Sequence, residues 1–312
     1  MIYAMMAREL GLSATYVRNI SISAHHRYKV YTIPKRNGGR RIISHPAKEL
    51  KVLQRWLVDE IFEAIPLHDA ALGYRAGVGI GKIVQRHSGS RYFLRMDFAD
   101  FFESIRARDI QHLLAKNWGG LPISLPKADI DRIVHIVCRG NALTIGAPSS
   151  PILSNAVMFE FDSAVQDKCR DLGCTYSRYA DDLFFSVNTP RVLEEVETFV
   201  LNLTSKLQYP KVEVNRRKTI HSSKKHRVRF LGLILTPAGG VSLGREKKRE
   251  IKSLVHGFKC GNLELESLIY LRGYLSFALS VEPSFINKTS KVSLCFCDIN
   301  EFNVFSSHHF FK

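Results

Sequence analysis

An acidic dipeptide between two apolar stretches constrains this chain more than any other feature. Asp181 and Asp182 separate Cys174 to Arg178 from Leu183 to Val187, and both stretches have the composition of short buried strands. Placing two like charges between such strands is costly unless a cation compensates them. A solvated turn is the simpler alternative, because aspartate favours turns.

A third carboxylate occupies a similar position. Asp97 ends the apolar stretch Tyr92 to Met96, which predicts another short strand. Carboxylates on separate elements can hold Mg²⁺ while leaving coordination positions for water and phosphate. Two such ions would activate an attacking hydroxyl and stabilise a leaving pyrophosphate, which is the requirement of nucleotidyl transfer.

The periodicity along the chain predicts an α+β fold, with an antiparallel sheet backed by helices as in ferredoxin-like proteins. The expected strands are 28–34, 40–44, 92–96, 174–178, 183–187, 212–215 and 228–235. The expected helices are short ones in the first 22 residues, one opened by Pro46, and those at about 107–117, 127–138, 151–169, 190–207, 245–259 and 263–279.

The charge balance favours a polyanionic partner. Lys and Arg total 45 against 29 Asp and Glu, a net charge of +16. Nucleic acid and an anionic membrane both fit this charge, as does a basic protein without such a partner. The sequence lacks a run of about 18 apolar residues and a signal peptide, so we expect no membrane span and a cytoplasmic protein.

The six cysteines predict reduced thiols and no disulfide framework. Cys295 and Cys297, with His308 and His309 nearby, are either a zinc site or plain tail residues. The tail 295–312 shows no helical period and supports no assignment.

Five motifs together resemble those of reverse transcriptases, in the family's order. They are Tyr179-Ala180-Asp181-Asp182, Asp97 to Phe102, Gly146 to Pro151, Asn215 with Lys218-Thr219, and Phe230 to Leu233. The resemblance implies a right-hand polymerase with fingers, a ferredoxin-like palm and a helical thumb. The corresponding parts are 1–90 for the N-terminal helices and fingers, 91–235 for the palm with inserted finger elements, and 236–312 for the thumb and tail.

Within that family the chain resembles the reverse transcriptases of bacterial retrons. The stretches that carry this likeness are Gly146 to Pro151, Tyr28 to Lys35, His45 to Leu50, and Leu243 to Lys247. Phe230 to Leu233 is closer to group II intron enzymes, which keeps an intron-like enzyme as an alternative. A non-catalytic RNA-binding module on a polymerase scaffold is a further alternative, which the three aspartates disfavour.

The resemblance assigns the catalytic acids. Asp97, Asp181 and Asp182 would be the catalytic residues, with Asp97 and Asp181 as principal ligands of two Mg²⁺ ions. Asp182 would be a ligand or a close outer-shell partner, and the Phe98 carbonyl a further metal contact.

The resemblance also implies a site for deoxynucleoside triphosphates. Phe102 would exclude a 2′-hydroxyl, although a core phenylalanine is the alternative. Gly146 and Ala147 would let template and nucleotide approach closely. Lys218 would donate a proton to pyrophosphate or simply contact a phosphate.

A basic hairpin tip is the expected triphosphate clamp. Lys35, Arg36, Arg40 and Arg41 gather there, and we expect Arg41 first and Lys35 second to contact the triphosphate. A solvated turn is the alternative.

Basic runs in the last third are expected to grip an RNA–DNA duplex, with solvated helix faces as the alternative. The residues assigned to this role are Arg216, Arg217, Lys224, Lys225, Arg245, Lys247 and Lys248. Tyr270, Tyr274 and Phe277 share helical spacing and are expected in the core.

The retron resemblance implies particular partners. The enzyme would bind its own structured noncoding RNA, prime from a 2′-hydroxyl within it, and make multicopy single-stranded DNA. It would stay bound to that RNA–DNA product and join an effector protein in anti-phage defence.

Overall fold

The computed structural model describes residues 1–35, 38–122 and 126–288. They form two compact units, the first of residues 1–76 and 94–221, the second of residues 77–93 with the chain from Ser222 onward. The three-part division into fingers, palm and thumb stays a prediction.

A four-stranded sheet organises the first unit. Its strands are β3 (Tyr92–Asp97), β4 (Thr175–Tyr179), β5 (Asp182–Val187) and β6 (Ile220–Ser223), in the spatial order β4-β5-β3-β6. Strands β4 and β5 form an antiparallel hairpin. With helices between β3 and β4 and between β5 and β6, the chain order is the β-α-β-β-α-β pattern of ferredoxin-like folds.

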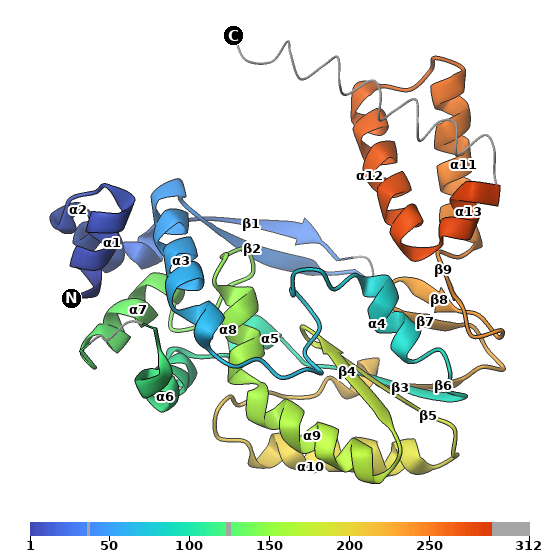
Figure 1. Cartoon of the computed structure of the whole chain (residues 1–312), viewed down its shortest axis with the longest axis horizontal. Helices are drawn as coiled ribbons and strands as arrows, with labels where there is room; N and C mark the ends of the chain where they lie inside the picture. The colour runs from blue at the N-terminus through green and yellow to red at the C-terminus, as the bar shows by residue number, and fades with distance from the viewer. Residues whose placement is uncertain (36–37, 123–125, 289–312) are drawn as a thin grey trace. The chain divides into compact units, whose positions relative to one another are not determined.

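Helices α8 (Ser150–Val157) and α9 (Phe159–Asp171) come before β4 in the chain, and α10 (Val192–Lys206) follows β5. Helix α9 packs on β4, α10 packs on β5, and the two helices lie side by side (Figure 1). Their inward residues, including Phe161, Val165, Val196 and Val200, are fully buried. This apolar layer stabilises the hairpin that carries the acidic turn.

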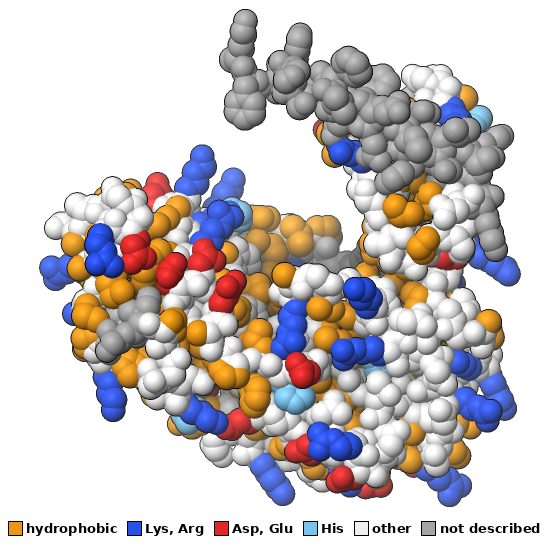
Figure 2. Space-filling model, in the orientation of Figure 1, with side chains coloured by type: hydrophobic (Ala, Val, Ile, Leu, Met, Phe, Trp, Pro, Cys, Tyr) orange, Lys and Arg blue, Asp and Glu red, His pale blue; other side chains and the backbone are white. Residues whose placement is uncertain are grey.

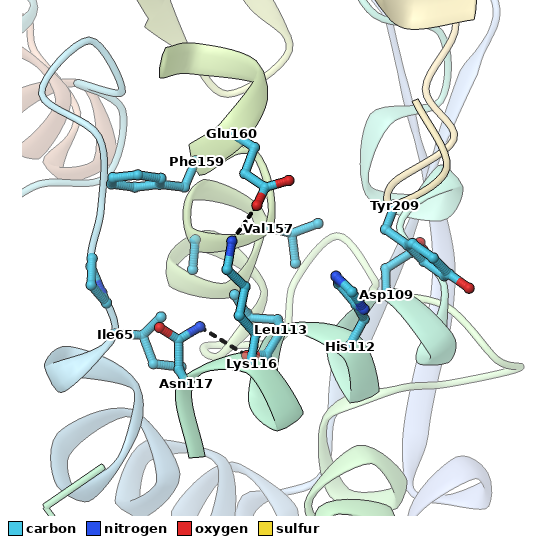
Figure 3. Close-up of a pocket in the computed structure, with 12 residues that line it drawn as sticks. Ile65, Asp109, His112, Leu113, Lys116, Asn117, Val157, Phe159, Glu160 and Tyr209 are labelled. Carbon is cyan, nitrogen blue, oxygen red and sulfur yellow. Dashed lines mark hydrogen bonds and ion pairs between the residues drawn. The ribbon is translucent and has the colours of Figure 1, made fainter. Parts of the chain in front are cut away.

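The rest of the first unit is a hairpin and a group of helices. The hairpin pairs β1 (Tyr28–Pro34) with β2 (Arg40–Pro46) in antiparallel register (Figure 1). The helices are α1 (Ile2–Leu10), α2 (Ala14–Ile22), α3 (Lys48–Glu60), α5 (Phe101–Ser104), α6 (Ala107–Asn117) and α7 (Asp129–Val137). Helix α6 and the junction of α8 and α9 border a pocket (Figure 3).

The second unit combines a small sheet with helices. It contains α4 (Ile80–Arg86), β7 (Val228–Phe230), β8 (Leu233–Leu235), β9 (Val241–Ser242), α11 (Arg245–Lys259), α12 (Leu265–Val281) and α13 (Pro283–Lys288). Glu282 joins these elements, because its carboxylate accepts hydrogen bonds from the Ser242 hydroxyl, the Leu243 amide and the Lys248 ammonium.

The α+β class and most expected elements are confirmed, with one correction among the helices and two among the strands. The single helix expected over 151–169 is two helices, α8 and α9, which meet at Met158. Val212 to Asn215 is no strand: only Val214 bridges to Phe98, because the chain leaves β3 after Asp97 and turns at Asp100 (φ 40°). The fourth strand is β6 instead. The single strand expected over 228–235 is a tight hairpin that turns at Leu231 and Gly232, both with positive φ.

The expected core position of the α12 aromatics is wrong. Tyr270 is 51% exposed, and Tyr274 and Phe277 are half-buried. Both tyrosine hydroxyls reach Glu250 on α11, and the Lys247 ammonium lies 5.7 Å and 5.6 Å from the ring centroids of Tyr274 and Phe277. The helical period is real, but these rings cover the seam between two helices and not a core.

The basic surplus is spread over the surface. Figure 2 shows Lys and Arg side chains scattered over the visible face, with Asp and Glu among them. Cys138, Cys169 and Cys174 are buried free thiols and Cys260 is an exposed one. Cys295, Cys297, His308 and His309 lie outside the described residues. In the part of the chain that the structure describes, every helix is too short or too polar to cross a membrane.

Candidate active site

The structure brings the three predicted catalytic carboxylates to one end of the two central strands. Asp97 ends β3, Asp182 begins β5, and these strands are neighbours in the sheet. The Phe98 amide donates a hydrogen bond to the Asp181 carbonyl at 3.0 Å, which ties the end of β3 to the acidic turn. Asp97 is only 4% exposed. Residues 84 positions apart in the sequence therefore form one acidic cluster.

Two basic side chains partly neutralise this cluster. The Lys218 ammonium lies 2.7 Å from Asp97 Oδ1, and the Arg95 guanidinium donates to Asp182 Oδ1 from Nε at 3.0 Å and Nη2 at 2.7 Å. Sequence reasoning missed Arg95. The signal was its place two residues before Asp97, because alternate residues of a strand share one face.

Burial and crowding disfavour negative charge at the turn. Burial, followed by the charges of Asp182 and Asp97, raises the pKa of Asp181 to about 6. Burial also raises the pKa of Asp182, although Arg95 opposes the shift. An added cation would relieve this repulsion.

The cluster fits a divalent cation in charge and in donor chemistry, since hard cations such as Mg²⁺ prefer carboxylate oxygens. Among the residues described, however, no three His, Cys, Asp or Glu side chains already stand together as a metal-binding group. The reason is that Asp97 is paired with Lys218, and Asp182 is paired with Arg95. Holding a metal would require them to exchange these partners for it.

Close packing fixes the backbone of the acidic turn. Ala180 has a left-handed conformation (φ 54°), and Gly73 lies directly against it. A Cβ atom at Gly73 would stand 2.9 Å from the Ala180 nitrogen, too close for any side chain. The Asn155 amide holds the Gly73 carbonyl at 2.8 Å. Sequence reasoning missed Gly73.

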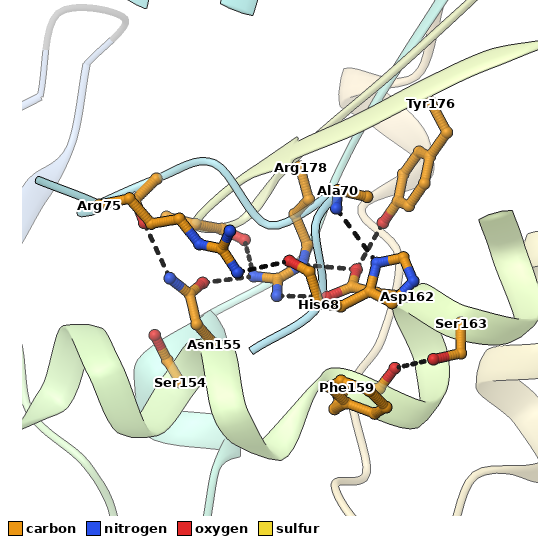
Figure 4. Close-up of polar contacts among 12 residues, drawn as sticks. His68, Ala70, Arg75, Ser154, Asn155, Phe159, Asp162, Ser163, Tyr176 and Arg178 are labelled. Carbon is orange, nitrogen blue, oxygen red and sulfur yellow. Dashed lines mark hydrogen bonds and ion pairs between the residues drawn. The ribbon is translucent and has the colours of Figure 1, made fainter. Parts of the chain in front are cut away.

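A fully buried ion pair lies beneath the turn (Figure 4). The Arg178 guanidinium donates to both Asp162 oxygens, from Nε at 2.9 Å and Nη2 at 2.6 Å, and from Nη1 to Asn155 Oδ1 and to the Ala180 carbonyl, each at 3.1 Å. The Tyr176 hydroxyl donates to Asp162 at 2.7 Å. The pair therefore connects α9, β4 and the acidic turn.

Phe102, the predicted sugar-selecting residue, differs in burial from its neighbour Phe101. Phe101 is core, stacked on Phe98 at 5.6 Å, whereas Phe102 is half-buried and its ring lies 6.4 Å from that of Tyr74. Tyr74 also lies 5.7 Å from Tyr179, so it belongs to the surroundings of the acidic turn. Nothing in the sequence marked Tyr74 for this position.

The predicted triphosphate clamp is exposed. Lys35 and Arg41 are both solvent-accessible, and Arg41 is near enough to Tyr74 to act on the pKa of its hydroxyl, which burial raises to about 12. Arg40 is exposed too, but its Nε donates to Thr32 at 2.6 Å. Arg36 lies outside the described residues.

Packing against β2 leaves no room for a side chain at Gly146. Its φ is 115°, and a Cβ there would stand 2.9 Å from the Ser44 carbonyl of β2, while the Ser44 amide donates to Ile145. Ala147 is buried. These contacts place β2 against the loop that starts α8. An approach of nucleotide to Gly146 and Ala147 stays a prediction.

The basic residues predicted to hold nucleic acid differ in solvent exposure and in their contacts within the protein. Arg216, Arg217, Lys225 and Arg245 are exposed. The other three are half-buried and engaged within the second unit: Lys224 donates to the Ser88 carbonyl, Lys247 covers two α12 rings, and Lys248 pairs with Glu282.

Replacing Arg178 by Met should destabilise the fold by about 3–5 kcal/mol, because it leaves the Asp162 carboxylate buried without its cation. Urea unfolding would measure the loss. Arg170→Ala is the control, since the exposed pair of Arg170 with Asp167 should contribute less than about 1 kcal/mol. Equal effects of the two substitutions would contradict a structural role for the buried pair.

Asp181→Asn should stabilise the metal-free protein by roughly 1–3 kcal/mol at about pH 8. The raised pKa of Asp181 means that the folded state resists its ionisation, a penalty that grows as the pH rises toward 6 and is complete above it. Urea unfolding in EDTA at about pH 8 and about pH 5 should show the gain shrink on acidification. Adding Mg²⁺ should stabilise the native chain more than the variant.

The control for that measurement is Asp100→Asn, an exposed aspartate of the Asp97 to Phe102 motif, which should change stability by less than about 0.5 kcal/mol. An Asp181→Asn protein that is less stable than the native chain in EDTA would show that the carboxylate is not under repulsion.

Comparison with known proteins identifies the chain. The family model for reverse transcriptase (RNA-dependent DNA polymerase) matches residues 33–235. The retron Ec83 reverse transcriptase of Escherichia coli is 36% identical in an alignment 277 positions long, which covers 85% of this chain and 86% of that protein. The retron Mx162 reverse transcriptase of Myxococcus xanthus is 32% identical in an alignment 312 positions long, which covers 89% of this chain and 64% of that longer protein.

Solved structures show the same fold at low identity. The telomerase of Candida albicans, solved with a fragment of telomeric RNA, matches with a TM-score of 0.50 at 14% identity, over 88% of this chain and 61% of that chain. That of Candida tropicalis, without RNA, matches with a TM-score of 0.50 over 85% of this chain and 58% of its own. By its fold, its motifs and these relatives, the chain belongs to the reverse-transcriptase family and, within it, to the reverse transcriptases of retrons.

Proposed function

We propose that this RNA-directed DNA polymerase serves a retron, making multicopy single-stranded DNA from its cognate noncoding RNA. The observation that carries the catalytic assignment is the hydrogen bond from Phe98 to Asp181, which brings Asp97, Asp181 and Asp182 to one end of β3 and β5. An acidic cluster at the end of a sheet, with a fixed backbone, suits chemistry on a polyanionic triphosphate only when cations are added.

Reverse transcriptases use divalent metal ions, and we propose two Mg²⁺ ions here, held by Asp97, Asp181 and the Phe98 carbonyl with Asp182 alongside. Bound metal would supply the charge that activates the attacking hydroxyl and stabilises the leaving pyrophosphate. The chain's own part is to keep the acids together despite repulsion. Lys218 and Arg95 do so in the metal-free protein, and Lys218, once released from Asp97, is free to contact phosphate.

The nucleotide would enter beside these acids. Arg41 and Lys35 supply positive charge for the triphosphate of a deoxynucleotide, and Phe102 lies next to Tyr74, where it would press on the sugar. The half-buried state of Phe102, beside a fully packed Phe101, supports a gate over a core role. Gly146 and Ala147 complete the proposed nucleotide site.

The four exposed basic residues are the best candidates for gripping RNA and its DNA copy: Arg216, Arg217, Lys225 and Arg245. Lys224, Lys247 and Lys248 remain in the proposal, but their ion pairs and hydrogen bonds within the second unit mean that substitutions there would mix folding with binding.

The finer biology is proposed from the resemblance to retron enzymes. We infer that a structured noncoding RNA supplies both the template and the priming 2′-hydroxyl, that the enzyme stays with its RNA–DNA product in the cytoplasm, and that an effector protein joins it in anti-phage defence.

Gly73→Ala should cut DNA synthesis by about tenfold or more, because the new methyl must push the Ala180 nitrogen and displace the acids. Primer extension on an RNA template would measure the effect. Gly79→Ala in the same loop is the matched control: its Cβ would meet nothing within 4 Å and its φ of −78° suits alanine. Equal activities of both variants would argue against a fixed turn.

Phe102→Ala should raise the incorporation of ribonucleotides relative to deoxynucleotides, because it opens space for a 2′-hydroxyl. Single-nucleotide kinetics with each substrate would give the ratio. Phe101→Leu is the control, since a core change should lower stability and leave the ratio unchanged. An unaltered ratio in Phe102→Ala would make Phe102 a packing residue.

Co-expression with the noncoding RNA of its own locus should yield a branched RNA–DNA molecule, because priming from a 2′-hydroxyl leaves a 2′,5′ linkage. Treatment with debranching enzyme should shift this product on a denaturing gel. The Asp181→Asn, Asp182→Asn double variant should bind the RNA and make no DNA. A product that is linear from the start would remove the retron assignment and leave the family assignment intact.

A further inference from the structure

A pocket unrelated to the acidic cluster opens on the first unit. It has a volume of about 150 Å³ and lies between α6, the junction of α8 and α9, and the segment at Tyr209 (Figure 3). None of the residues proposed above for catalysis, nucleotide or nucleic acid lines it. Its size suits one side chain better than a whole small-molecule ligand, whose pockets usually exceed about 300 Å³.

The walls of the pocket are apolar and its rim is aromatic. Ile65, Leu113 and Ala156 are buried around it, whereas Phe159 and Tyr209 are 36% and 44% exposed. The Tyr209 ring stacks on His112 with centroids 4.6 Å apart and planes 10° apart, which holds both rings in place. Exposed, pre-positioned aromatic rings around a small pocket are typical of the places where protein partners insert an anchor side chain.

A buried carboxylate in this pocket has an unused oxygen. The Asp109 side chain is fully buried, and its Oδ2 accepts the Arg106 amide at 2.7 Å. Within residues 1–35, 38–122 and 126–288, Oδ1 receives no hydrogen bond, and its nearest cation, Arg108 Nε, is 3.8 Å away. Burial raises the pKa of this carboxyl. An acceptor left without a donor in such surroundings is costly, and a donor from outside would remove the cost.

We propose that the pocket receives the guanidinium of an arginine presented by a partner protein. The charge and N–H donors of that group match Asp109 Oδ1, its plane can stack on the Phe159 ring, and its aliphatic stem matches Leu113 and Val157. The Tyr209 ring already has His112 stacked on it and the Arg108 guanidinium 5.9 Å from its centroid. A nucleic-acid partner is disfavoured, because Asp109 and Glu160 line the pocket and Lys116, which would attract phosphate, is already paired with Glu160.

The test uses two capped pentapeptides that differ only in charge, one with a central arginine between leucines and one with citrulline, its neutral isostere. Methyl-labelled protein would report binding by NMR at Leu113 and Val157. The arginine peptide should cause saturable shifts at these methyls, and the citrulline peptide should bind at least about tenfold more weakly. Equal binding of the two, or no saturable shift with arginine, would overturn the proposal.

Three variants test whether the arginine peptide binds in this pocket. Asp109→Asn should bring the two peptides to within about twofold of each other, whereas Asp167→Asn, an exposed aspartate on α9 away from the pocket, should leave the discrimination intact. Val157→Phe should block binding by filling the pocket while leaving Asp109 and its contact to Arg106 unchanged. Retention of binding by Val157→Phe would place the peptide elsewhere and refute the site.

Two further measurements separate this inference from the polymerase. Primer extension by all three variants should match the native chain, which shows that they are folded. A short single-stranded RNA should leave the Leu113 and Val157 methyls undisturbed. If RNA shifts them and the arginine peptide does not, the pocket belongs to a nucleic-acid surface and the proposed protein partner is wrong.

Discussion

The buried pair of Arg178 and Asp162 is the interaction on which the acidic site depends. Both side chains are fully buried, so removing either partner would strand a charge in the interior. The pair is tolerable because Tyr176, Asn155 and the Ala180 carbonyl satisfy the remaining donors and acceptors. Burial alone works against the guanidinium charge, yet the surrounding acceptors raise the pKa of Arg178 above its ordinary value. The pair also fixes the acidic turn, because Arg178 donates a hydrogen bond to the carbonyl of the left-handed Ala180.

The same turn is held from its other sides by backbone. Residues 70–72 run along β4, where the Arg178 amide donates to Ala70 and the Leu72 amide donates to the Arg178 carbonyl. Gly73 then packs on Ala180, and Phe98 binds Asp181 from β3. Residues 70–73, Phe98 and Asn155, which are far apart in the sequence, therefore all contact the segment Arg178 to Asp181. Such over-determination is what lets a strained backbone and three repelling carboxylates persist without a bound cation.

The sequence predicted the parts that depend on local pattern. The strands on both sides of Asp181 and Asp182, the strand ending at Asp97, and the helices at 107–117 and 245–259 follow from periodicity, and their limits match the structure to within a few residues. It failed where tertiary pairing decides: Val212 to Asn215 has strand composition but forms a single β-bridge, between Val214 and Phe98. The aromatic residues of α12 failed differently, since helical spacing identifies a covered face without saying whether a core or a neighbouring helix covers it.

The acidic residues could be found from the sequence because they stand in motifs of fixed residue type and order, whereas Arg95 and Arg178 could not. Arg95 is one of many arginines in a basic chain, and Arg178 reads as an ordinary strand residue. The importance of Arg178 comes from its burial, which no spacing rule encodes. The spacing of Arg95 and Asp97 places both on one face of β3, but it does not show that Arg95 pairs with Asp182. Lys218 and Arg95 carry charge opposite to that of the acids and pair directly with Asp97 and Asp182, so the protein can hold these carboxylates together without an added cation. The fold alone therefore assembles the three acids, and Lys218 and Arg95 balance part of their charge.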